Sequence, residues 1–85
     1  MSIAQAKAGI AQSEQSAGES ISQLQGAMAT IDQAITTMQT AIQGTSHSSA
    51  EQAIAHYQQA KSKLEEAITM VQSGIASGQQ YSASL

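Results

Sequence analysis

The chain of 85 residues contains no cysteine, proline, tryptophan or phenylalanine. The lack of cysteine excludes disulfides, thiolate nucleophiles and thiolate metal ligands. The lack of proline permits long uninterrupted helices, because proline is the strongest helix breaker. With two tyrosines as its only aromatic residues, the chain has little material for a compact core, since aromatic side chains bury the most area. We therefore expect one domain that gains stability from a partner.

Positive charge is also scarce. The basic residues are Lys7, Lys61 and Lys63, and the formal net charge is −3. Binding to nucleic acid or to an anionic membrane surface needs a concentrated positive patch, so neither is expected. No apolar run approaches the length of a membrane span, and the N-terminal residues lack a Sec-type signal pattern. We expect no membrane insertion, while export by another route stays open.

A heptad seam runs along the first half of the chain. Its apolar residues alternate three and four positions apart, which is typical of a coiled coil. These residues are Ile21, Leu24, Met28, Ile31, Ile35, Met38 and Ile42. Towards the N-terminus Ala17, Ile10 and Ile3 keep the phase, but Glu14 and Lys7 interrupt it. The sequence predicts a long helix whose first part has a weaker seam.

A second seam follows with the same spacing. It consists of Ile54, Tyr57, Lys61, Leu64, Ile68, Val71 and Ile75. Lys61 is its one charged member, and its aliphatic stem can pack while its ammonium group reaches water. The pattern ends near Gly78, where residues become Gly- and Ser-rich, so we expect residues 79–85 to form a flexible tail.

Helix stop and start signals separate the two seams. Gly44 follows the first seam, where a left-handed helix terminus favours glycine. Ser48 and Glu51 fit a capping box at the start of the next helix, with Ser49 and Gln52 as the alternative frame. A connection this short makes the helices antiparallel.

These signals predict an all-α antiparallel two-helix hairpin that forms a single domain over residues 1–85. We expect one helix over about 3–43, a turn over 44–48 and a second helix over about 49–78. Folding the chain at the turn places Met38 opposite Ile54 and brings Lys61 within reach of Asp32, where an ion pair can form.

One flank of the folded seam carries only small residues. In the first helix they are Ser20, Ala27, Ala34 and Ala41, and in the second they are Ala53, Ala60, Ala67 and Gly74. Both rows face the same side of an antiparallel hairpin, and we call them the small-residue lane. Because alanine is the best helix former, such a row also occurs for helix propensity alone. A one-sided apolar lane nevertheless suits close docking of another helix pair, so we expect dimerisation into a four-helix bundle.

The sequence shows no group of residues with the spacing that catalysis or metal binding requires. His47 falls in the turn and His56 outside the seam, and no cysteine joins them in a metal-ligand pattern. The serines form no arrangement with histidine and an acid that we can place in a pocket, and the glycines form no phosphate-binding loop. We expect neither enzymatic activity nor a cofactor. Tyr81 stands out among Ser and Gln, either packing on Ile10 or serving as part of a recognised tail.

The layout resembles the WXG superfamily, small helical hairpins exported by type VII secretion. The closest part is "GTSHSSAEQAIAHYQQAKSKLEEAITMVQSGIASGQQY". Gly44 matches the glycine of the family's Trp-x-Gly, but Ile42 stands at the tryptophan position. Tyr81 matches the tyrosine of the family's tail signal, but Leu85 stands at its acidic position.

The resemblance implies a protein–protein interaction module that pairs with a similar hairpin as a homodimer or heterodimer. A larger secreted protein is a further candidate partner. It implies a secreted protein without a Sec-type signal, cytoplasmic before export. An intracellular coiled-coil adaptor and a subunit of a self-assembling helical rod are the alternatives.

Overall fold

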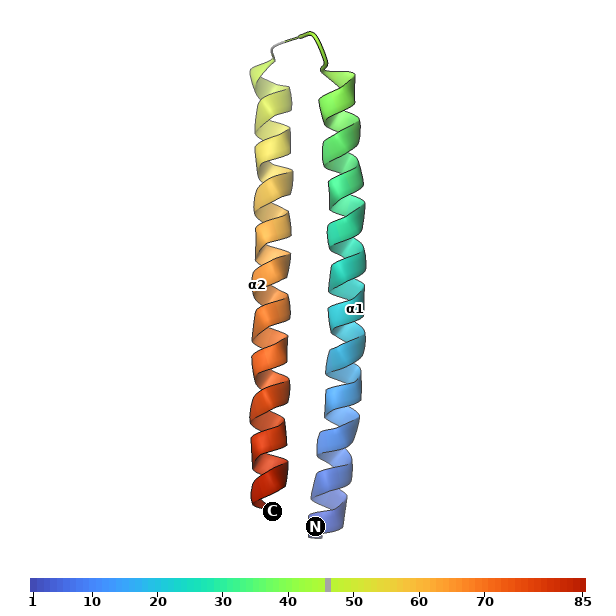
Figure 1. Cartoon of the computed structure of the whole chain (residues 1–85), viewed down its shortest axis with the longest axis vertical. Coiled ribbons are helices and arrows are strands. Elements are labelled where there is room, and N and C mark those ends of the chain that lie inside the picture. The colour runs from blue at the N-terminus through green and yellow to red at the C-terminus, as the bar shows by residue number, and fades with distance from the viewer. Residues whose placement is uncertain (46) are drawn as a thin grey trace.

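The computed structural model describes residues 1–45 and 47–85 and shows an all-α antiparallel hairpin, which confirms the predicted fold class (Figure 1). Helix α1 spans Ile3–Ala41 and helix α2 spans Ser48–Ser84. The helices lie side by side in a rod of 64 × 15 × 14 Å. Both termini lie at one end of this rod, the open end, and the connection lies at the other, the turn end.

Helix α1 begins with a capping box. The Ser2 hydroxyl accepts a hydrogen bond from the Gln5 backbone N–H at 3.1 Å, and the Ser2 backbone N–H donates to Gln5 Oε1 at 3.0 Å. Two N–H groups that lack partners within the helix are thereby satisfied. This local chemistry fixes the start of α1 at the open end.

The turn begins slightly earlier than expected, because α1 ends at Ala41 rather than near residue 43. Ile42 caps the helix, and its carbonyl accepts from the Thr45 backbone N–H at 2.9 Å. Gly44 lies between them with φ at +82°, so the predicted left-handed glycine is confirmed. Ser46, also within the predicted turn, lies outside the described residues.

The predicted capping box at the start of α2 is wrong by one residue. His47 is the N-cap, and its carbonyl accepts from the backbone N–H groups of Ala50 and Glu51, both at 3.1 Å. Ser48 is therefore the first helical residue and cannot cap the helix, and the alternative frame at Ser49 lies deeper inside it. The His47 side chain makes no capping bond. The acidic Glu51 still favours the first turn through the helix dipole.

The predicted flexible tail is also wrong, because α2 continues to Ser84. The seam spacing extends past Ile75 to Gly78 and Ser82, and both are half-buried. A Cβ added at Gly78 would lie 3.8 Å from Ile10 Cγ2, so the backbone of α2 runs close to α1 there. Packing against α1 and the lack of proline thus outweigh the weak helix propensity of glycine and serine.

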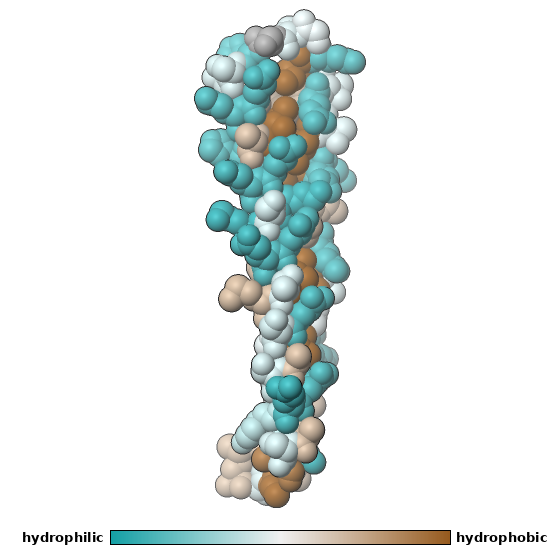
Figure 2. Space-filling view, turned by 60° about the vertical axis from the view of Figure 1, so that its left-hand side comes forward, coloured by the Kyte–Doolittle hydropathy of each residue, from teal (hydrophilic) through white to brown (hydrophobic). Residues whose placement is uncertain are grey.

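Little of the seam is sealed from solvent. Ile35 is 8% exposed and is the only buried hydrophobic side chain among the described residues. Tyr57, predicted as core, is 37% exposed, and the remaining apolar seam residues are half-buried. Apolar side chains form a narrow stripe along the rod, bordered by hydrophilic groups (Figure 2). Neither described helix combines the length and hydrophobicity that a membrane span requires.

Candidate interaction surface

The small-residue lane contains both half-buried and exposed positions. Ala34, Ala53, Ala60 and Ala67 are half-buried beside the seam, as is Ser20. Ala27, Ala41 and Gly74 are exposed. The Ser20 hydroxyl donates to the Ala17 carbonyl at 2.8 Å, so its polar group is satisfied within its own helix. The lane thus contains no side chain longer than a hydroxymethyl group and no charge.

Asp32, on the flank of the seam opposite the lane, forms an ion pair with Lys61 of the seam. Lys61 Nζ lies 2.9 Å from Asp32 Oδ1, which confirms the pair expected from the register of the two seams. The side chains are 33% and 53% exposed, respectively. The hydrogen bond to Asp32 and its negative charge, with a smaller contribution from Glu65, raise the pKa of Lys61. This flank is charged and faces water, so the two flanks of the seam differ in chemistry.

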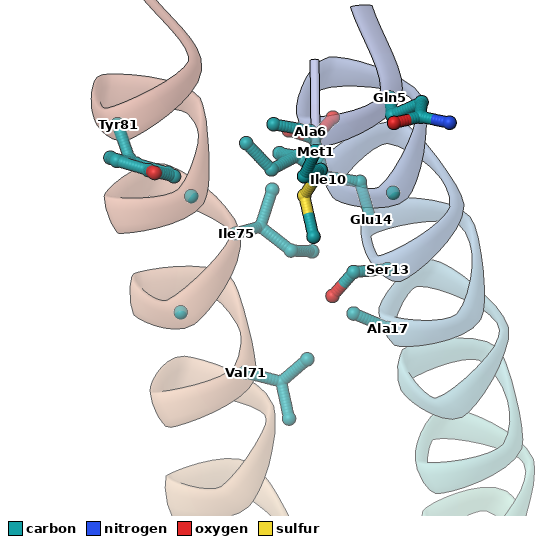
Figure 3. A pocket seen from close by; sticks show the side chains of 13 residues that line it. Met1, Gln5, Ala6, Ile10, Ser13, Glu14, Ala17, Val71, Ile75 and Tyr81 are labelled. Carbon is teal, nitrogen blue, oxygen red and sulfur yellow. The ribbon is translucent and has the colours of Figure 1, made fainter. Parts of the chain in front are cut away.

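A groove opens between the helices at the open end and has a volume of about 600 Å³. Side chains of α1 and α2 project into it from both sides, among them Ile10, Ser13, Ala17, Val71 and Ile75 (Figure 3). We call this the open-end groove. Its lining comprises Met1, Gln5, Ala6, Gly9, Ile10, Ser13, Glu14, Ala17, Val71, Gly74, Ile75, Gly78 and Tyr81.

The groove exists because large apolar residues are missing from this part of the seam. Near the turn end, Ile and Met side chains fill the space between the helices. At the open end the seam of α1 carries Ala17 and Glu14, and the facing seam of α2 carries Gly78. Sequence reasoning recognised the interrupted seam but did not predict the groove. The signal was present in Glu14 at an apolar seam position together with the facing glycine.

Glu14 is the only charged side chain in the groove lining. It is half-buried, and the one ion pair among the described residues is Lys61–Asp32 at another site. Tyr81 is 57% exposed and lines the groove together with Ile10. Its position is compatible with packing against Ile10, which was one of the two expectations for this residue. Tyr81 lies within α2 and not in an extended tail.

The residues considered for metal binding or catalysis do not gather. His47 lies at the turn end and His56 is exposed on α2, both remote from the open-end groove. Among the described residues, no three His, Cys, Asp or Glu side chains are placed to hold a metal ion. The groove offers one carboxylate, a phenol and small polar groups, which suit binding of another surface.

Comparisons of the chain with known protein families, with curated proteins and with solved structures found no match.

Proposed function

We propose that the chain is a non-enzymatic protein–protein interaction module that pairs with a second helical hairpin through its small-residue lane. The observation that carries this proposal is that Ile35 is the only buried hydrophobic side chain in the part of the hairpin that the structure describes. Two helices that leave the rest of their seam half-exposed gain little from hydrophobic burial, and helical stability in proteins comes mostly from such packing. A partner on the lane would cover the seam and complete a four-helix bundle.

The exposed area supports the same proposal. The hairpin exposes 6026 Å². A compact protein of 8.8 kDa would expose about 4,800 Å² by the usual scaling with mass. The excess is roughly 1,200 Å² by that scaling, and a standard interface buries about 800 Å² on each partner. One hairpin of similar size docked along the lane would remove an area of this order.

The lane is the face best suited to a partner. Its small side chains allow the backbones of two helix pairs to approach closely, and the opposite flank would require the Lys61–Asp32 pair to lose water. Packing along the lane also carries no unpaired polar group into the interface, because the Ser20 hydroxyl already donates to the Ala17 carbonyl.

We further propose that the hairpin is a WXG-like small protein, exported by a type VII secretion system or paired with cargo of one. The layout supports this proposal: helices of 39 and 37 residues are joined by a short turn with a left-handed glycine. Tyr81 is the candidate for the signal tyrosine.

Ala34→Glu tests the interface. It places a carboxylate on the lane in each copy, so we expect the dimer dissociation constant to rise at least about 100-fold, or about 2.7 kcal/mol. Gln33→Glu is the control, because it adds the same charge at an exposed neighbouring position. Sedimentation velocity measures both. Equal dimer constants for the two variants would refute the lane as the interface.

Export is tested separately by tracking the chain in culture medium with and without a type VII secretion ATPase. Deletion of residues 81–85 should abolish ATPase-dependent export if Tyr81 is part of the signal. Unchanged export of the truncated chain refutes the signal assignment. If the full chain does not reach the medium at all, the export proposal fails and the alternative, an intracellular coiled-coil adaptor, is favoured.

A further inference from the structure

The open-end groove continues the small-residue lane. Ala6 and Ser13 extend the lane's row on α1 at the same seven-residue spacing, and Tyr81 extends its row on α2. All three line the groove, as does Gly74, the last residue of the lane. A partner lying along the lane therefore passes over the groove.

Tyr81 is the one large side chain on this extended face. Every other position of its row is alanine or glycine, and the ring is 57% exposed. Because α2 remains helical through Ser84, the position of Tyr81 on the face is fixed by the helix. Figure 3 shows it on α2 across the groove from Ala6 and Ile10. The face thus carries one projection and one hollow at the same end.

We propose that the partner is a second copy of this chain, aligned so that both open ends lie together, with Tyr81 of each copy seated in the open-end groove of the other. The inference rests on the proposed function and adds the identity and direction of the partner. A two-fold axis along the rod makes the pair self-complementary, since each copy supplies one projection and receives one.

The height of Tyr81 along the rod favours this alignment. Gly78 of α2 lies beside Ile10 of α1. Tyr81 is about one helical turn further toward the open end, so it lies near the height of Ala6 and Gly9. A two-fold axis along the rod preserves height and sets Tyr81 against the partner's α1 near Ala6, Gly9 and Ser13. These side chains are small, and nothing lies within 4 Å of a Cβ added at Gly9. The reverse alignment would set Tyr81 near Ala41 and Ala53 of the partner. In that half of the seam, Ile and Met side chains fill the space between the helices.

The chemistry of the groove also fits a tyrosine. Its apolar part, including Val71 and Ile75, can receive the ring, while Glu14 offers a half-buried carboxylate without an ion pair. A phenol O–H is a good donor to a carboxylate, and tyrosine is favoured at interfaces because it combines an apolar body with such a donor. The small residues of the lane then let the helices approach closely enough for the ring to enter.

The direction of the pair can be measured with one spin label per chain. The chain has no cysteine, so His47→Cys gives a single labelling site at the turn end, on a side chain that makes no capping bond. With both open ends together, the two labels should lie within about 30 Å, since neighbouring helices of a bundle are about 8–10 Å apart. In the reverse alignment they would be separated by most of the 64 Å length.

The seat of Tyr81 is tested by two substitutions. We expect Tyr81→Ala to raise the dimer dissociation constant at least tenfold, and Tyr81→Phe to raise it less because the ring remains. Gly9→Leu fills the groove in a position open within the single hairpin and improves helix propensity, so it should weaken the dimer without lowering helicity. Gln80→Ala, on an exposed neighbouring position, is the control.

The results of these experiments distinguish failure of this inference from failure of the lane interface. A dimer with distant labels, or one that Tyr81→Ala and Gly9→Leu leave as tight as Gln80→Ala does, overturns this inference and leaves the lane interface standing. A dimer that Ala34→Glu does not weaken refutes the lane itself. A chain that stays monomeric at all concentrations overturns the pairing of two copies and with it this inference.

Discussion

Replacing Ile35 by aspartate perturbs the one buried position within residues 1–45 and 47–85. Ile35 is 8% exposed, so the substitution removes a buried aliphatic side chain and places a carboxylate there. Loss of the burial costs about 1.5–3 kcal/mol, and an unpaired carboxylate in an apolar site adds roughly 2 kcal/mol or more. A domain of 85 residues has a free energy of unfolding of about 4–13 kcal/mol. We therefore expect Ile35→Asp to lower the free energy of unfolding by about 3.5–5 kcal/mol or more, which unfolds a chain at the lower end of this range.

The assay is urea unfolding followed by far-UV circular dichroism. Thr37→Asp is the matched control, because it adds the same charge two residues away on an exposed position of α1. Its free energy of unfolding should stay within about 0.5 kcal/mol of the unmodified chain. If Ile35→Asp keeps the helicity and the urea midpoint of Thr37→Asp, the packing of the seam around Ile35 is not what stabilises the hairpin.

Two smaller predictions concern the turn and the charged flank. Gly44→Ala should destabilise the hairpin by about 1–2 kcal/mol, since φ is +82° there, while Gly26→Ala inside α1 should stabilise it by up to about 1 kcal/mol; urea unfolding with both changes in the same direction contradicts the turn geometry. Asp32→Asn should lower the pKa of Lys61, measured by NMR titration, because Asp32 raises it. That raised pKa stabilises the fold at pH below the ordinary value of 10.5, and the contribution disappears as pH rises through the higher folded pKa. A melting temperature that falls equally with rising pH in the unmodified chain and in Asp32→Asn rules out this contribution.

The hairpin and its register could be predicted because they depend on periodicity. Two seams with the same spacing, joined at a glycine, admit one simple folded alignment. The contact between Lys61 and Asp32 follows from that alignment, and the structure contains it. The start of α1 could also have been read, since the Ser2–Gln5 pair forms a capping box that the sequence displays.

The end of α2 and its first residue could not be predicted by the same reasoning. Glycine and serine after Ile75 favour a helix end by local propensity, but α2 runs close to Ile10 of α1 at Gly78 and stays helical to Ser84. At the turn, Ser48 and Ser49 both have capping chemistry, so local preference favours a serine as the N-cap of α2. The helix instead begins directly after His47, whose carbonyl accepts from the backbone N–H groups of Ala50 and Glu51.

The open-end groove depends on a feature that a seam pattern does not show directly. An interrupted seam predicts weak packing, but the shape of the gap depends on how closely the backbones approach. Here the approach of α2 to α1 at Gly78 leaves a hollow bordered by small residues rather than separated helices.

We propose that a second copy covers the half-exposed seam of the hairpin, and such pairing makes the melting temperature depend on protein concentration. Association of folded chains stabilises them by mass action, so the melting temperature should rise steadily as the concentration of the chain is raised about a hundredfold. Circular dichroism follows the transition, and sedimentation at the same concentrations should show two chains per particle. One chain per particle, with the same melting temperature at every concentration, would rule out the pairing of two copies.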